Sequence, residues 1–359
     1  MTQRTPSSPE NDSARTVVVT GGAGFIGSAL VRHLVGHTPH RVVTVDALTY
    51  AADERALESV RASDRHVFEH VDVCDGLALA DLFARHRPDS VVHLAAESHV
   101  DRSIDRPADF VRTNVVGTAT LLDTVRGWLD GDGIDSVRRD RFRFVHVSTD
   151  EVYGSLELGS GRRFDEGSPY DPHSPYAASK AASDHFVRAW AHTYGLPVLL
   201  THSTNNYGPW QYPEKLIPVV VLRALAGQGI PVYGTGDNVR DWIHVDDHVR
   251  GLVAVLERGR VGETYDLGAR CERSNLSVVL EICDLLDEFS PGSPVVPHRE
   301  LLSLVADRPG HDLRYATDPG KAERELGWRA EIAWGEGLRE TVRWMVRERA
   351  ALEARLSRT

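Results

Sequence analysis

Three evenly spaced glycines follow a short apolar run near the start of the chain. Residues 16–20 (Thr-Val-Val-Val-Thr) are all β-branched, which is typical of a strand buried in a parallel sheet. Gly21, Gly24 and Gly27 come next, and apolar residues at helical spacing fill residues 25–35. Such a turn brings backbone N–H groups and a helix N-terminus close to a pyrophosphate. In this strand–turn–helix context the glycines predict a dinucleotide-binding site rather than an ordinary tight turn.

The chain after this turn keeps alternating between strand-like and helix-like segments. This alternation predicts an α/β fold with a Rossmann-type doubly wound parallel sheet. The expected strands cover residues 41–46, 66–71, 90–94 and 142–147, and the expected helices cover residues 77–85, 108–128 and 174–194. Residues 131–140 are polar and contain glycine, which predicts an exposed loop.

The regular alternation fades after residue 207. Glycine and proline turn signals interrupt short segments there, and helical patterns return over residues 276–289 and 336–356. These features predict a smaller mixed α/β C-terminal substrate lobe packed against the sheet. We therefore divide the chain into a disordered leader (1–15), a cofactor-binding Rossmann domain (16–207) and a substrate lobe (208–350), with some crossing of the chain between the last two.

Composition and charge narrow the class of protein further. The chain has 359 residues, of which 41% are hydrophobic, enough for one large or two medium cores. Its formal charge of −11 argues against a nucleic-acid or anionic-membrane surface. No apolar run approaches the ~20 residues that span a bilayer, and the polar N-terminus lacks a signal-peptide core. Cys74, Cys271 and Cys283 have no metal-like spacing, so we expect no metal site and free thiols in a reducing cytoplasm.

The ends of the next two expected strands indicate which dinucleotide is bound. Asp46 ends the second strand, where a carboxylate can accept hydrogen bonds from both ribose hydroxyls of NAD and would repel the extra phosphate of NADP. Asp72 and Val73 end the third strand and are placed to contact the adenine. The pattern therefore predicts NAD as the cofactor, and a solvated strand end remains the alternative interpretation of Asp46.

A tyrosine, a lysine and a Ser-Thr pair predict a hydride-transfer centre. Tyr176 and Lys180 are four residues apart, so on a helix they share one face. A nearby ammonium and a positive nicotinamide ring would lower the tyrosine pKa from about 10, so that Tyr176 acts as a base, and Lys180 could also hold the nicotinamide ribose. Ser148 and Thr149 end the strand 142–147, at the edge where parallel sheets bind ligands, and Thr149 could hydrogen-bond the hydroxyl being oxidised.

Asp150 and Glu151 add two neighbouring carboxyl groups to this centre. Simple hydride transfer does not need such a pair, whereas a reaction that also removes a proton and expels water does. Adjacent residues on a strand point to opposite faces, so both acids reach one substrate only if the chain leaves strand geometry here. The competing interpretation is that the two acids merely favour a helix N-terminus.

Taken together, the motifs resemble the extended short-chain dehydrogenase/reductases, and most closely the dTDP-glucose 4,6-dehydratases among them. The resemblance covers roughly residues 16–347. Its most specific element is the Thr-Asp-Glu triplet, because related sugar-nucleotide epimerases usually carry small or polar residues in place of the acids. The matching motifs lie at residues 20–27, 93–103, 148–154, 176–180, 205–209, 213–218, 240–242 and 306–312.

The resemblance implies that NAD is tightly bound and recycled within one turnover. dTDP-glucose would become dTDP-4-keto-6-deoxyglucose and water, through internal hydride transfer from C4 to NAD and then to C6. Tyr176, helped by Thr149, would take the C4 hydroxyl proton, Glu151 would abstract the C5 hydrogen, and Asp150 would protonate the leaving C6 hydroxyl. Two carboxyl groups whose pKa values are separated by their environment suit these last two roles.

The same resemblance assigns the remaining site residues. Asn205, Arg240 and Asn275 would hold the diphosphate, for which the planar fork of arginine is well suited. The catalytic set is Thr149, Asp150, Glu151, Tyr176 and Lys180. The cofactor-binding set is Gly21, Gly24, Phe25, Ile26, Gly27, Asp46, Leu48, Thr49, Asp72, Val73, Leu94, Ala95, Ala96, Thr113, Tyr176 and Lys180. The substrate-binding set is Ser98, Thr149, Asn205, Arg240, Asn275, the base-binding residues Glu214, Lys215, Leu216 and Tyr233, and His311 and Tyr315.

Three departures from the family pattern leave the sugar and base preference open. His202 stands where the family usually has Asn or Arg, residues 51–53 read Ala-Ala-Asp instead of Ala-Gly-Asn, and residues 210–212 form a less common Trp-Gln-Tyr loop. One alternative is the same chemistry on UDP-glucose or another nucleotide sugar. The other is a sugar-nucleotide 4-epimerase or decarboxylase, although the acid pair argues against an epimerase and the sequence shows no dedicated site for a C6 carboxylate.

The resemblance also implies a homodimer formed through the helices of residues 108–128 and 174–194. The apolar residues of the first helix fit an interface or a sheet-facing side equally well: Phe110, Val111, Val115, Leu121, Leu122 and Val125. Only three of the 41 basic residues are lysine. This bias resembles that of high-GC actinobacteria, where such enzymes often serve antibiotic deoxysugar biosynthesis. Cell-wall rhamnose supply uses the same reaction, and both pathways stay open.

Overall fold

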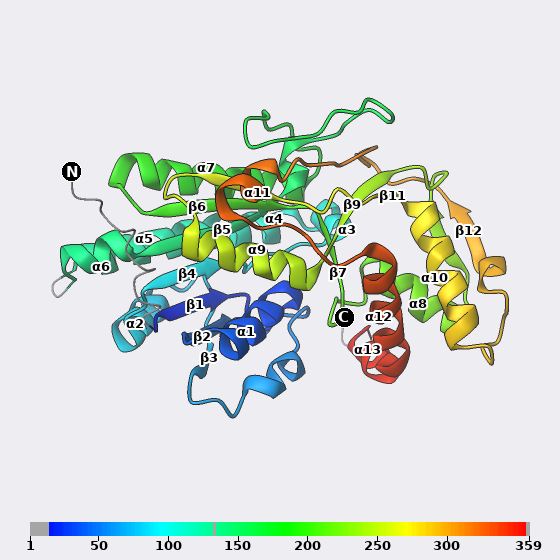
Figure 1. Cartoon of the computed structure of the whole chain (residues 1–359), viewed down its shortest axis with the longest axis horizontal. Helices are drawn as coiled ribbons and strands as arrows, with labels where there is room; N and C mark the ends of the chain where they lie inside the picture. The colour runs from blue at the N-terminus through cyan, green and yellow to red at the C-terminus, as the bar shows by residue number, and fades with distance from the viewer. Residues whose placement is uncertain (1–13, 132–133, 357–359) are drawn as a thin grey trace, which may run out of the picture.

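A seven-stranded parallel sheet forms the centre of the molecule (Figure 1). The computed structural model describes residues 14–131 and 134–356, so the predicted leader falls outside the described residues except for its last two. The strand order is β10-β6-β5-β4-β1-β2-β3, and every neighbouring pair is parallel, which confirms the predicted sheet. The strands are β1 (Thr16–Thr20), β2 (Arg41–Asp46), β3 (His66–His70), β4 (Ser90–His93), β5 (Arg143–Thr149), β6 (Val198–Ser203) and β10 (Thr264–Leu267).

Helices cover both faces of this sheet (Figure 1). Successive side chains of β1 point to opposite faces, so Val17 and Val19 belong to one core and Val18 to the other. Because both faces are covered, the strands are apolar throughout rather than alternating. The helices against the first core are α1 (Phe25–His37), α9 (Val245–Arg258) and α11 (Gly320–Leu326), and those against the second are α2 (Gly76–His86), α5 (Gly117–Asp130) and α7 (Pro175–Tyr194).

A smaller mixed α/β lobe with its own core follows, as predicted. Tyr207, Trp242 and Trp334 belong there to one core with apolar residues of four helices. The chain returns to the large sheet in between, because β10 and α9 belong to the first region. The elements of the lobe are β7 (Asn205–Tyr207), β8 (Ile230–Tyr233), β9 (Val239–His244), β11 (Glu272–Ser274), β12 (Leu302–Val305), α8 (Leu216–Leu225), α10 (Asn275–Phe289), η4 (His298–Leu301), α12 (Trp334–Arg347) and α13 (Arg349–Leu356).

The prediction of a loop over residues 131–140 is wrong in its second half, where the short helix α6 (Ser136–Arg141) forms. Asp135 caps this helix, because its carboxylate accepts a hydrogen bond from the backbone N–H of Arg138 at 2.7 Å. None of the residues of α6 is buried. A helix without an apolar face leaves no periodic pattern in the sequence, which is why the prediction missed it.

Two of the three longest predicted helices are interrupted. The helix expected at residues 108–128 comprises α4 (Pro107–Phe110), the π-helical turn η2 (Val111–Val116) and α5. The wide turn lets the Asn114 side chain pair with both backbone groups of Glu97, at 2.8 and 3.0 Å. The helix expected at residues 336–356 breaks at Glu348, after which α13 turns inward and buries Leu352 and Arg355. Three short helices complete the fold: η1 (Glu54–Val60), α3 (Val100–Asp105) and η3 (Asp150–Tyr153).

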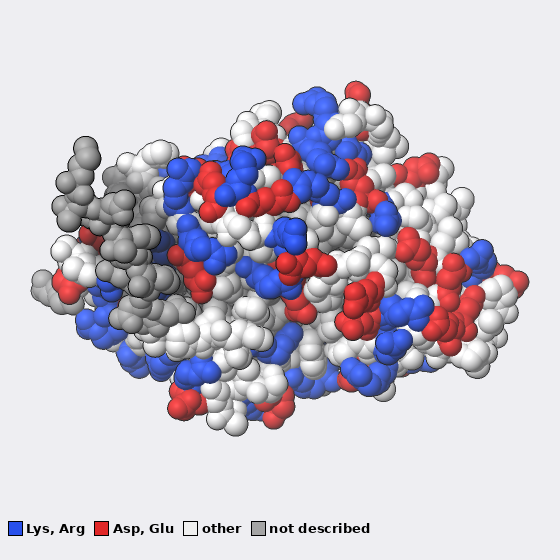
Figure 2. All heavy atoms as spheres, viewed as in Figure 1, with Lys and Arg blue, Asp and Glu red and all other residues white. Residues whose placement is uncertain are grey.

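The surface in Figure 2 carries acidic and basic side chains interspersed over the same face. Within residues 14–131 and 134–356, no helix combines the length and the apolar character needed to cross a membrane. The same residues contain no cluster of three or more His, Cys, Asp or Glu side chains arranged to hold a metal ion.

Candidate active site

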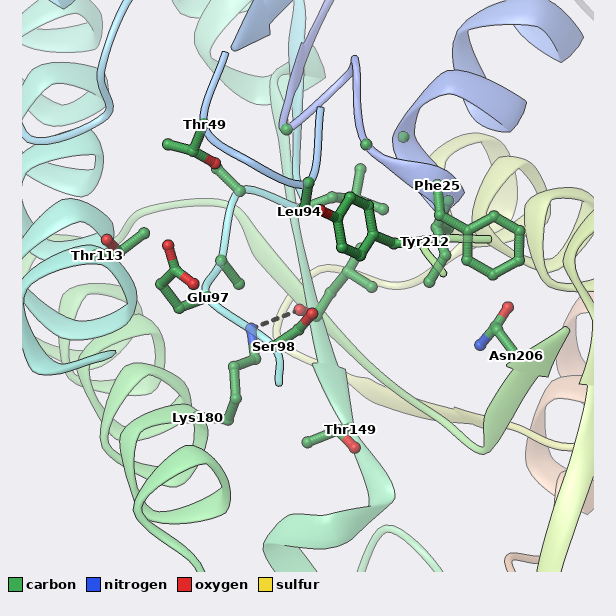
Figure 3. Close-up of a pocket in the computed structure, with 18 of the residues that line it drawn as sticks. Phe25, Thr49, Leu94, Glu97, Ser98, Thr113, Thr149, Lys180, Asn206 and Tyr212 are labelled. Atoms are coloured by element: carbon green, nitrogen blue, oxygen red, sulfur yellow. Dashed lines mark hydrogen bonds between the residues drawn. The ribbon is translucent and has the colours of Figure 1, made fainter. Parts of the chain in front are cut away.

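A cavity of about 340 Å³ opens at the carboxyl edge of the sheet, beside the neighbouring strands β1 and β4. The strand order reverses between these two strands, and α/β sheets bind their ligands at such a point. The glycine turn after β1, the segment 94–98 after β4 and the end of β5 form one side of the cavity. Loops that lead into the smaller lobe form the other side (Figure 3).

Two glycines of the turn, Gly21 and Gly27, have no room for a side chain. Gly21 has a φ of +67°, and a Cβ there would lie 2.7 Å from the backbone nitrogen of Ala95. A Cβ on Gly27 would lie 2.1 Å from the carbonyl oxygen of Gly21. The backbone therefore packs against the segment after β4, and α1 begins at Phe25 beside the cavity. This cradle fits the pyrophosphate of a dinucleotide at a helix N-terminus.

Asp46 is oriented at the cavity by two backbone donors. The N–H of Ala23 donates to its Oδ2 at 2.9 Å, and the N–H of Leu48 donates to its Oδ1 at 2.8 Å. Burial raises the pKa of Asp46, whereas the two hydrogen bonds oppose that rise. The carboxylate thus joins the glycine turn to the loop after β2, a placement that fits a contact with the ribose diol of NAD.

Lys180 joins α7 to the end of β5. Its Nζ donates a hydrogen bond to the backbone carbonyl of Val147 at 2.8 Å, and burial lowers its pKa to about 8. Ser174 caps the helix by accepting a hydrogen bond from the N–H of Ala177 at 3.0 Å. Tyr176 and Lys180 both line the cavity, one turn apart on α7, as their spacing predicts.

In the protein without a bound cofactor, the hydroxyl of Tyr176 keeps its proton. Burial raises the pKa of its hydroxyl, and so does the charge of Glu151, whereas a hydrogen bond with Thr149 lowers it. The prediction named two positive charges that favour the phenolate, the Lys180 ammonium and the nicotinamide ring, and the ammonium alone is not sufficient. Further positive charge in the cavity, of the kind that an oxidised nicotinamide carries, is needed for Tyr176 to act as a base.

The chain leaves strand geometry at the acid pair, as the two neighbouring carboxyl groups require. The 3-10 helix η3 begins directly after Thr149, whose hydroxyl accepts a hydrogen bond from the backbone N–H of Glu151 at 3.3 Å. Asp150 and Glu151 both line the cavity. They also occupy the first turn of a helix, so the competing interpretation describes their position but does not explain why both face the cavity.

The two carboxyl groups have different electrostatic environments. Asp150 is 2% exposed, and burial followed by the charge of Glu151 raises its pKa well above the usual range. Its Oδ2 is buried and has no hydrogen-bond partner within the described part of the chain. Burial also raises the pKa of Glu151, but the charges of Arg240, Arg308 and Lys215 oppose that rise. Asp150 is therefore the group that keeps a proton, and Glu151 is the group that more readily loses one.

The cavity brings together most of the residues predicted from the sequence. Leu48 contributes instead through its hydrogen bond to Asp46. The predicted residues that line the cavity are Gly21, Gly24, Phe25, Ile26, Gly27, Asp46, Thr49, Asp72, Val73, Leu94, Ala95, Ala96, Ser98, Thr113, Thr149, Asp150, Glu151, Tyr176, Lys180, Asn205, Glu214 and Lys215. The predicted residues outside its lining are Leu216, Tyr233, Arg240, Asn275, His311 and Tyr315.

Two of these outlying residues are tied to the acid pair. The guanidinium of Arg240 lies 4.3 Å from the ring centre of Tyr315 and donates to the carbonyl of Asp312 at 3.0 Å. The charge of Glu151 acts on both Arg240 and Tyr315. Tyr233 and His311 form a separate edge-to-face pair with ring centres 6.2 Å apart. Leu216 and Asn275 begin the helices α8 and α10.

Several cavity residues were missed by the sequence interpretation. Tyr212 meets Tyr50 edge to face at 5.3 Å, and Tyr50 donates to Glu214 at 3.2 Å. Tyr212 belongs to the unusual loop 210–212, which was the one available signal for it. Ser148, which the sequence places beside Thr149 at the strand end, also lines the cavity. The residues that line the cavity without having been predicted are Val45, Ala47, Ala51, Ala52, Val71, Glu97, Val147, Ser203, Thr204, Asn206, Gln211 and Tyr212.

The last helix closes the cavity wall formed by the loop after β2. Arg355 of α13 is 7% exposed, and its Nη2 donates to the carbonyl of Ala51, 304 residues earlier, at 2.9 Å. Its Nη1 lies 3.2 Å from Oδ2 of Asp53, and its guanidinium lies 4.7 Å from the ring centre of Tyr212. Two of the three departures from the family pattern, at residues 51–53 and 210–212, therefore meet at Arg355.

Known proteins that are similar to this chain act on nucleotide sugars, by their names. A sequence model of the family described as GDP-mannose 4,6 dehydratase matches residues 18–341. The dTDP-glucose 4,6-dehydratase 1 of Escherichia coli K12 is 53% identical over 335 residues, which cover 91% of this chain and 92% of that protein. The dTDP-glucose 4,6-dehydratase of Haemophilus influenzae is 52% identical over 330 residues, with 91% and 97% covered.

The solved structures that resemble this chain are also named as enzymes of nucleotide sugars, at lower sequence identity. DesIV of Streptomyces venezuelae, a dTDP-glucose 4,6-dehydratase solved with NAD bound, is 45% identical with a TM-score of 0.85 and covers 95% of this chain and 99% of that one. A UDP-glucose 4-epimerase of Thermotoga maritima is 28% identical with a TM-score of 0.78 and covers 92% and 99%. The epimerase therefore shares the architecture, and the dehydratase shares more of the sequence.

Proposed function

The chain belongs to the nucleotide-sugar 4,6-dehydratases, and within them to the dTDP-glucose 4,6-dehydratases, and on that premise we propose which of its residues carry out the reaction. It is an NAD-dependent hydro-lyase that converts dTDP-glucose into dTDP-4-keto-6-deoxyglucose and water. NAD, when bound, supplies a site that accepts a hydride and gives it back within one turnover.

The glycine turn, Asp46 and Lys180 hold the cofactor. Gly21 and Gly27 keep the backbone close enough to meet the pyrophosphate, and Asp46 binds the adenosine ribose. Lys180, fixed by the carbonyl of Val147, reaches the nicotinamide ribose from α7. The cradle, the oriented carboxylate and the ammonium face one cavity, which supports NAD rather than NADP.

Four residues divide the proton transfers among themselves. Tyr176, in hydrogen-bond contact with Thr149, takes the proton of the C4 hydroxyl. The C4 ketone then acidifies the C5 hydrogen, which Glu151 removes, while Asp150 protonates the departing C6 hydroxyl as water. Glu151 returns its proton to C5 when C6 receives the hydride. The proton on Tyr176 finally restores Asp150 through solvent, so the balance is the loss of one water.

The observation that carries this assignment is the split between two neighbouring carboxyl groups at one cavity. A dehydration needs one group that donates a proton and one that accepts a proton. Asp150 has a strongly raised pKa, which suits the proton donor. Three nearby cations oppose the rise in the pKa of Glu151, which suits the proton acceptor.

The smaller lobe binds the nucleotide part of the substrate. Asn205, Arg240 and Asn275 hold the diphosphate, supported by the position of Arg240 next to the acid pair. Glu214 and Lys215 line the cavity and, with Leu216, form the base-binding region. Tyr233 stacks on the base, and Ser98, His311 and Tyr315 complete the contacts with the substrate.

Two alternative functions are separated by specific features. UDP-glucose lacks the methyl group of thymine and carries ribose in place of deoxyribose. The similar proteins named above are dTDP-glucose 4,6-dehydratases, which favours dTDP-glucose as the substrate. A 4-epimerase needs no second acid, and the placement of both Asp150 and Glu151 in the cavity argues against it.

The protein forms a homodimer through η2 and α7. Phe110, Leu121, Leu122 and Val125 are buried within one chain, so they do not supply an interface. Val111, Val116 and Phe186 are instead 52%, 49% and 37% exposed on these two adjacent elements. Replacing Val111 and Phe186 with Glu should give a monomer by light scattering.

A cytoplasmic location is proposed on the state of the thiols. Cys74, Cys271 and Cys283 are all free. Burial raises the pKa of the Cys271 thiol to about 11 and that of Cys283 to about 12, which makes both thiols unreactive. Fractionation of the native cells, followed by detection of the protein, tests this location.

The deciding experiment uses purified protein without added cofactor. The protein is incubated with dTDP-glucose and, separately, with UDP-glucose, and the product mass is followed. Loss of one water from dTDP-glucose alone is the expected result. Loss from UDP-glucose only would move the substrate assignment. Conversion to the galacto isomer without loss of water would overturn the roles of Asp150 and Glu151.

A further inference from the structure

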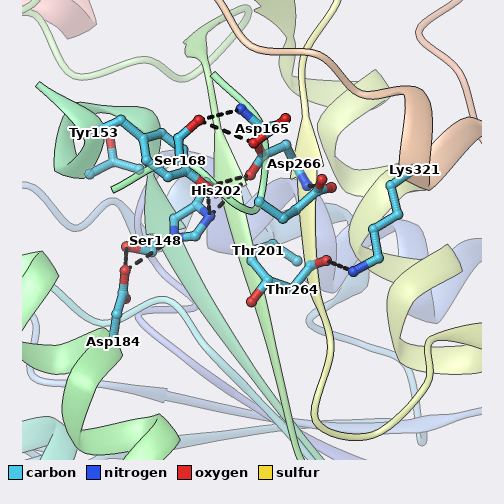
Figure 4. Close-up of polar contacts among 12 residues, drawn as sticks. Ser148, Tyr153, Asp165, Ser168, Asp184, Thr201, His202, Thr264, Asp266 and Lys321 are labelled. Carbon is cyan, nitrogen blue, oxygen red and sulfur yellow. Dashed lines mark hydrogen bonds and ion pairs between the residues drawn. The ribbon is translucent and has the colours of Figure 1, made fainter. Parts of the chain in front are cut away.

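A fully buried histidine lies between two carboxylates (Figure 4). His202 is the penultimate residue of β6, with a side chain that has no exposed surface. Its Nδ1 lies 3.0 Å from Oδ1 of Asp266, and its Nε2 lies 3.1 Å from Oδ2 of Asp184. Asp266 comes from β10 and Asp184 from α7, so the imidazole ties three elements together.

Two tyrosines complete a nearly symmetric arrangement around the ring. The hydroxyl of Tyr153 is 2.9 Å from Nδ1 and donates to Oδ1 of Asp266 at 3.0 Å. The hydroxyl of Tyr170 is 2.9 Å from Nε2 and donates to Oδ2 of Asp184 at 2.9 Å. Each phenol proton is thus directed at a carboxylate, and each phenol oxygen is left to accept from His202.

Both ring nitrogens of His202 therefore lie at hydrogen-bond distance from a carboxylate oxygen, which can only accept. A neutral imidazole would place one bare lone pair against a carboxylate at about the distance of a hydrogen bond, which is repulsive. The imidazolium donates from both nitrogens and satisfies the arrangement. In agreement, hydrogen bonds from His202 to the two carboxylates outweigh burial and raise its pKa to about 9.

This charge continues in a row that ends at the catalytic lysine. Asp184 and Lys180 are one turn apart on α7, and Asp184 raises the pKa of Lys180 against the effect of burial. Asp184 is also among the charges that raise the pKa of Tyr176. Asp266, His202, Asp184 and Lys180 thus alternate in sign, and His202 is the cation that compensates Asp184 from the side away from Lys180.

The other groups around this row do not replace the charge of His202. His146 of β5 has its Nε2 3.1 Å from Asp184, but burial and Lys180 lower its pKa to about 4, so it is neutral. Ser148 donates to Asp184 at 3.0 Å without carrying charge. Arg188 of α7 donates to the hydroxyl of Tyr170 at 3.1 Å, and Glu166 accepts from the backbone N–H of Asp266 at 3.0 Å. His185 contacts Tyr170, and Lys321 acts on Glu166.

We propose that His202 is a positioning residue for hydride transfer, whose fixed positive charge neutralises Asp184 so that the Tyr176–Lys180 pair does not experience an uncompensated buried carboxylate. Through Tyr153 it also holds η3, and through Asp184 it holds α7, so one residue connects the acid pair with the tyrosine and lysine. The proposal depends on the proposed function in one respect, which is that Tyr176 is the base that takes the C4 hydroxyl proton. It gives the unusual residue at this position a role in the site.

The first test is the charge state of His202 itself. Nitrogen NMR of the wild-type protein labelled in histidine should show two protonated ring nitrogens for one histidine at neutral pH, and that signal should be absent from His202→Asn. This readout does not depend on the cofactor or on turnover. A neutral tautomer at position 202 would overturn the proposal.

The second test is the pH dependence of hydride transfer, followed as reduction of bound NAD by dTDP-glucose in a single turnover. In His202→Asn the uncompensated Asp184 raises the pKa of Tyr176, so the acidic limb should move to higher pH. If the pKa of Tyr176 rises by one unit, the rate at pH values well below that pKa falls about tenfold. Asp184→Asn combined with His202→Asn removes both charges and should bring the limb back, whereas a purely structural role predicts that the double variant is worse.

Asp184→Asn alone keeps the test decisive if His202→Asn does not fold. It leaves the positive charges of His202 and Lys180, so the acidic limb should move to lower pH, and an unchanged or higher limb overturns the proposal. The matched control is Asp266→Asn, which keeps His202 paired with Asp184 and should leave the limb near that of the wild type. Failure of the wild type to dehydrate dTDP-glucose would count against the proposed function alone, because NAD reduction is read separately.

Discussion

Asp150 and Glu151 are neighbours in the chain, yet the charges of three cations favour the ionised form of Glu151, whereas burial and the charge of Glu151 raise the pKa of Asp150 against Arg240 alone among these cations. The charge of Glu151 therefore helps to set the protonation state of Asp150. The 3-10 turn that begins after Thr149 makes this possible, because it allows both side chains to face one cavity.

Asp150→Asn should uncouple oxidation from dehydration. An amide cannot protonate the departing hydroxyl, so we expect loss of water to slow by about 10²–10⁴-fold while the C4 oxidation continues. Reduced nicotinamide should accumulate on the enzyme in a stopped-flow absorbance trace after mixing with dTDP-glucose. Full dehydration at the wild-type rate would contradict the role of Asp150.

Glu151→Gln should have a different signature at the same turn. Without the base, the C5 hydrogen should not exchange with deuterated water, whereas in Asp150→Asn it should still exchange. Mass spectrometry of recovered dTDP-sugar in heavy water measures both variants side by side. Exchange in Glu151→Gln and none in Asp150→Asn would reverse the two assignments.

Gly27→Ala should abolish retention of NAD. Its Cβ would lie 2.1 Å from a backbone oxygen of Gly21, so the turn must open or α1 must shift. Gly36→Ala in the same helix is the matched control, because a Cβ there meets nothing within 4 Å. The control should retain NAD and gain up to about 1 kcal/mol of helix stability. Cofactor content of the purified proteins, measured by absorbance after denaturation, compares the two.

The charge of His202 should appear in the pH dependence of stability. Its folded pKa of about 9 lies above the unfolded value, so its contribution is present below pH ~6.5 and is lost as the pH rises through about 9. The shift corresponds to a contribution on the order of 3 kcal/mol. Lys180 has the opposite sign, because its folded pKa of about 8 is lowered. Urea unfolding of the wild type and His202→Asn should therefore give a free-energy difference that shrinks between pH ~7 and ~10.

Arg355→Ala should speed the release of NAD. The variant loses the contacts with Ala51, Asp53 and Tyr212 that close the loop after β2. We expect dissociation to be about tenfold faster, equivalent to about 1.4 kcal/mol. Arg347→Ala, which removes only an exposed pair with Glu348, is the control and should release NAD at the wild-type rate. Dissociation is measured by dilution into excess labelled NAD.

Local signals in the sequence were sufficient for the sheet and for the cofactor turn. The β-branched run of β1 and the spacing of Gly21, Gly24 and Gly27 both follow from backbone sterics, which act over a few residues. The helix α6 escaped prediction because it has no apolar face, and the π-helical turn η2 escaped because it keeps the apolar content of the surrounding helix.

The electrostatics of the site needed the structure. Identifying Tyr176, Asp150 and Glu151 as site residues required only motifs, but the order of their pKa values depends on which charges come near them in space. Arg308 and Lys215 act on Glu151 from segments far apart in the sequence. His202 was visible as a departure, yet its meaning depends on Asp184 and Asp266, which no spacing rule connects to it.

The hydrogen bond from Arg355 to Ala51 spans almost the whole chain, and this has a consequence for the order in which the molecule matures. The glycine turn and β2 can form once the residues up to the segment after β4 have left the ribosome, because β1, β2 and that segment supply their contacts. The contacts of Arg355 that fix the loop after β2 form only when α13 has been made and has docked. A nascent chain therefore acquires the glycine turn and the Asp46 carboxylate early, and the contacts that slow the release of a cofactor only after α13 has been made.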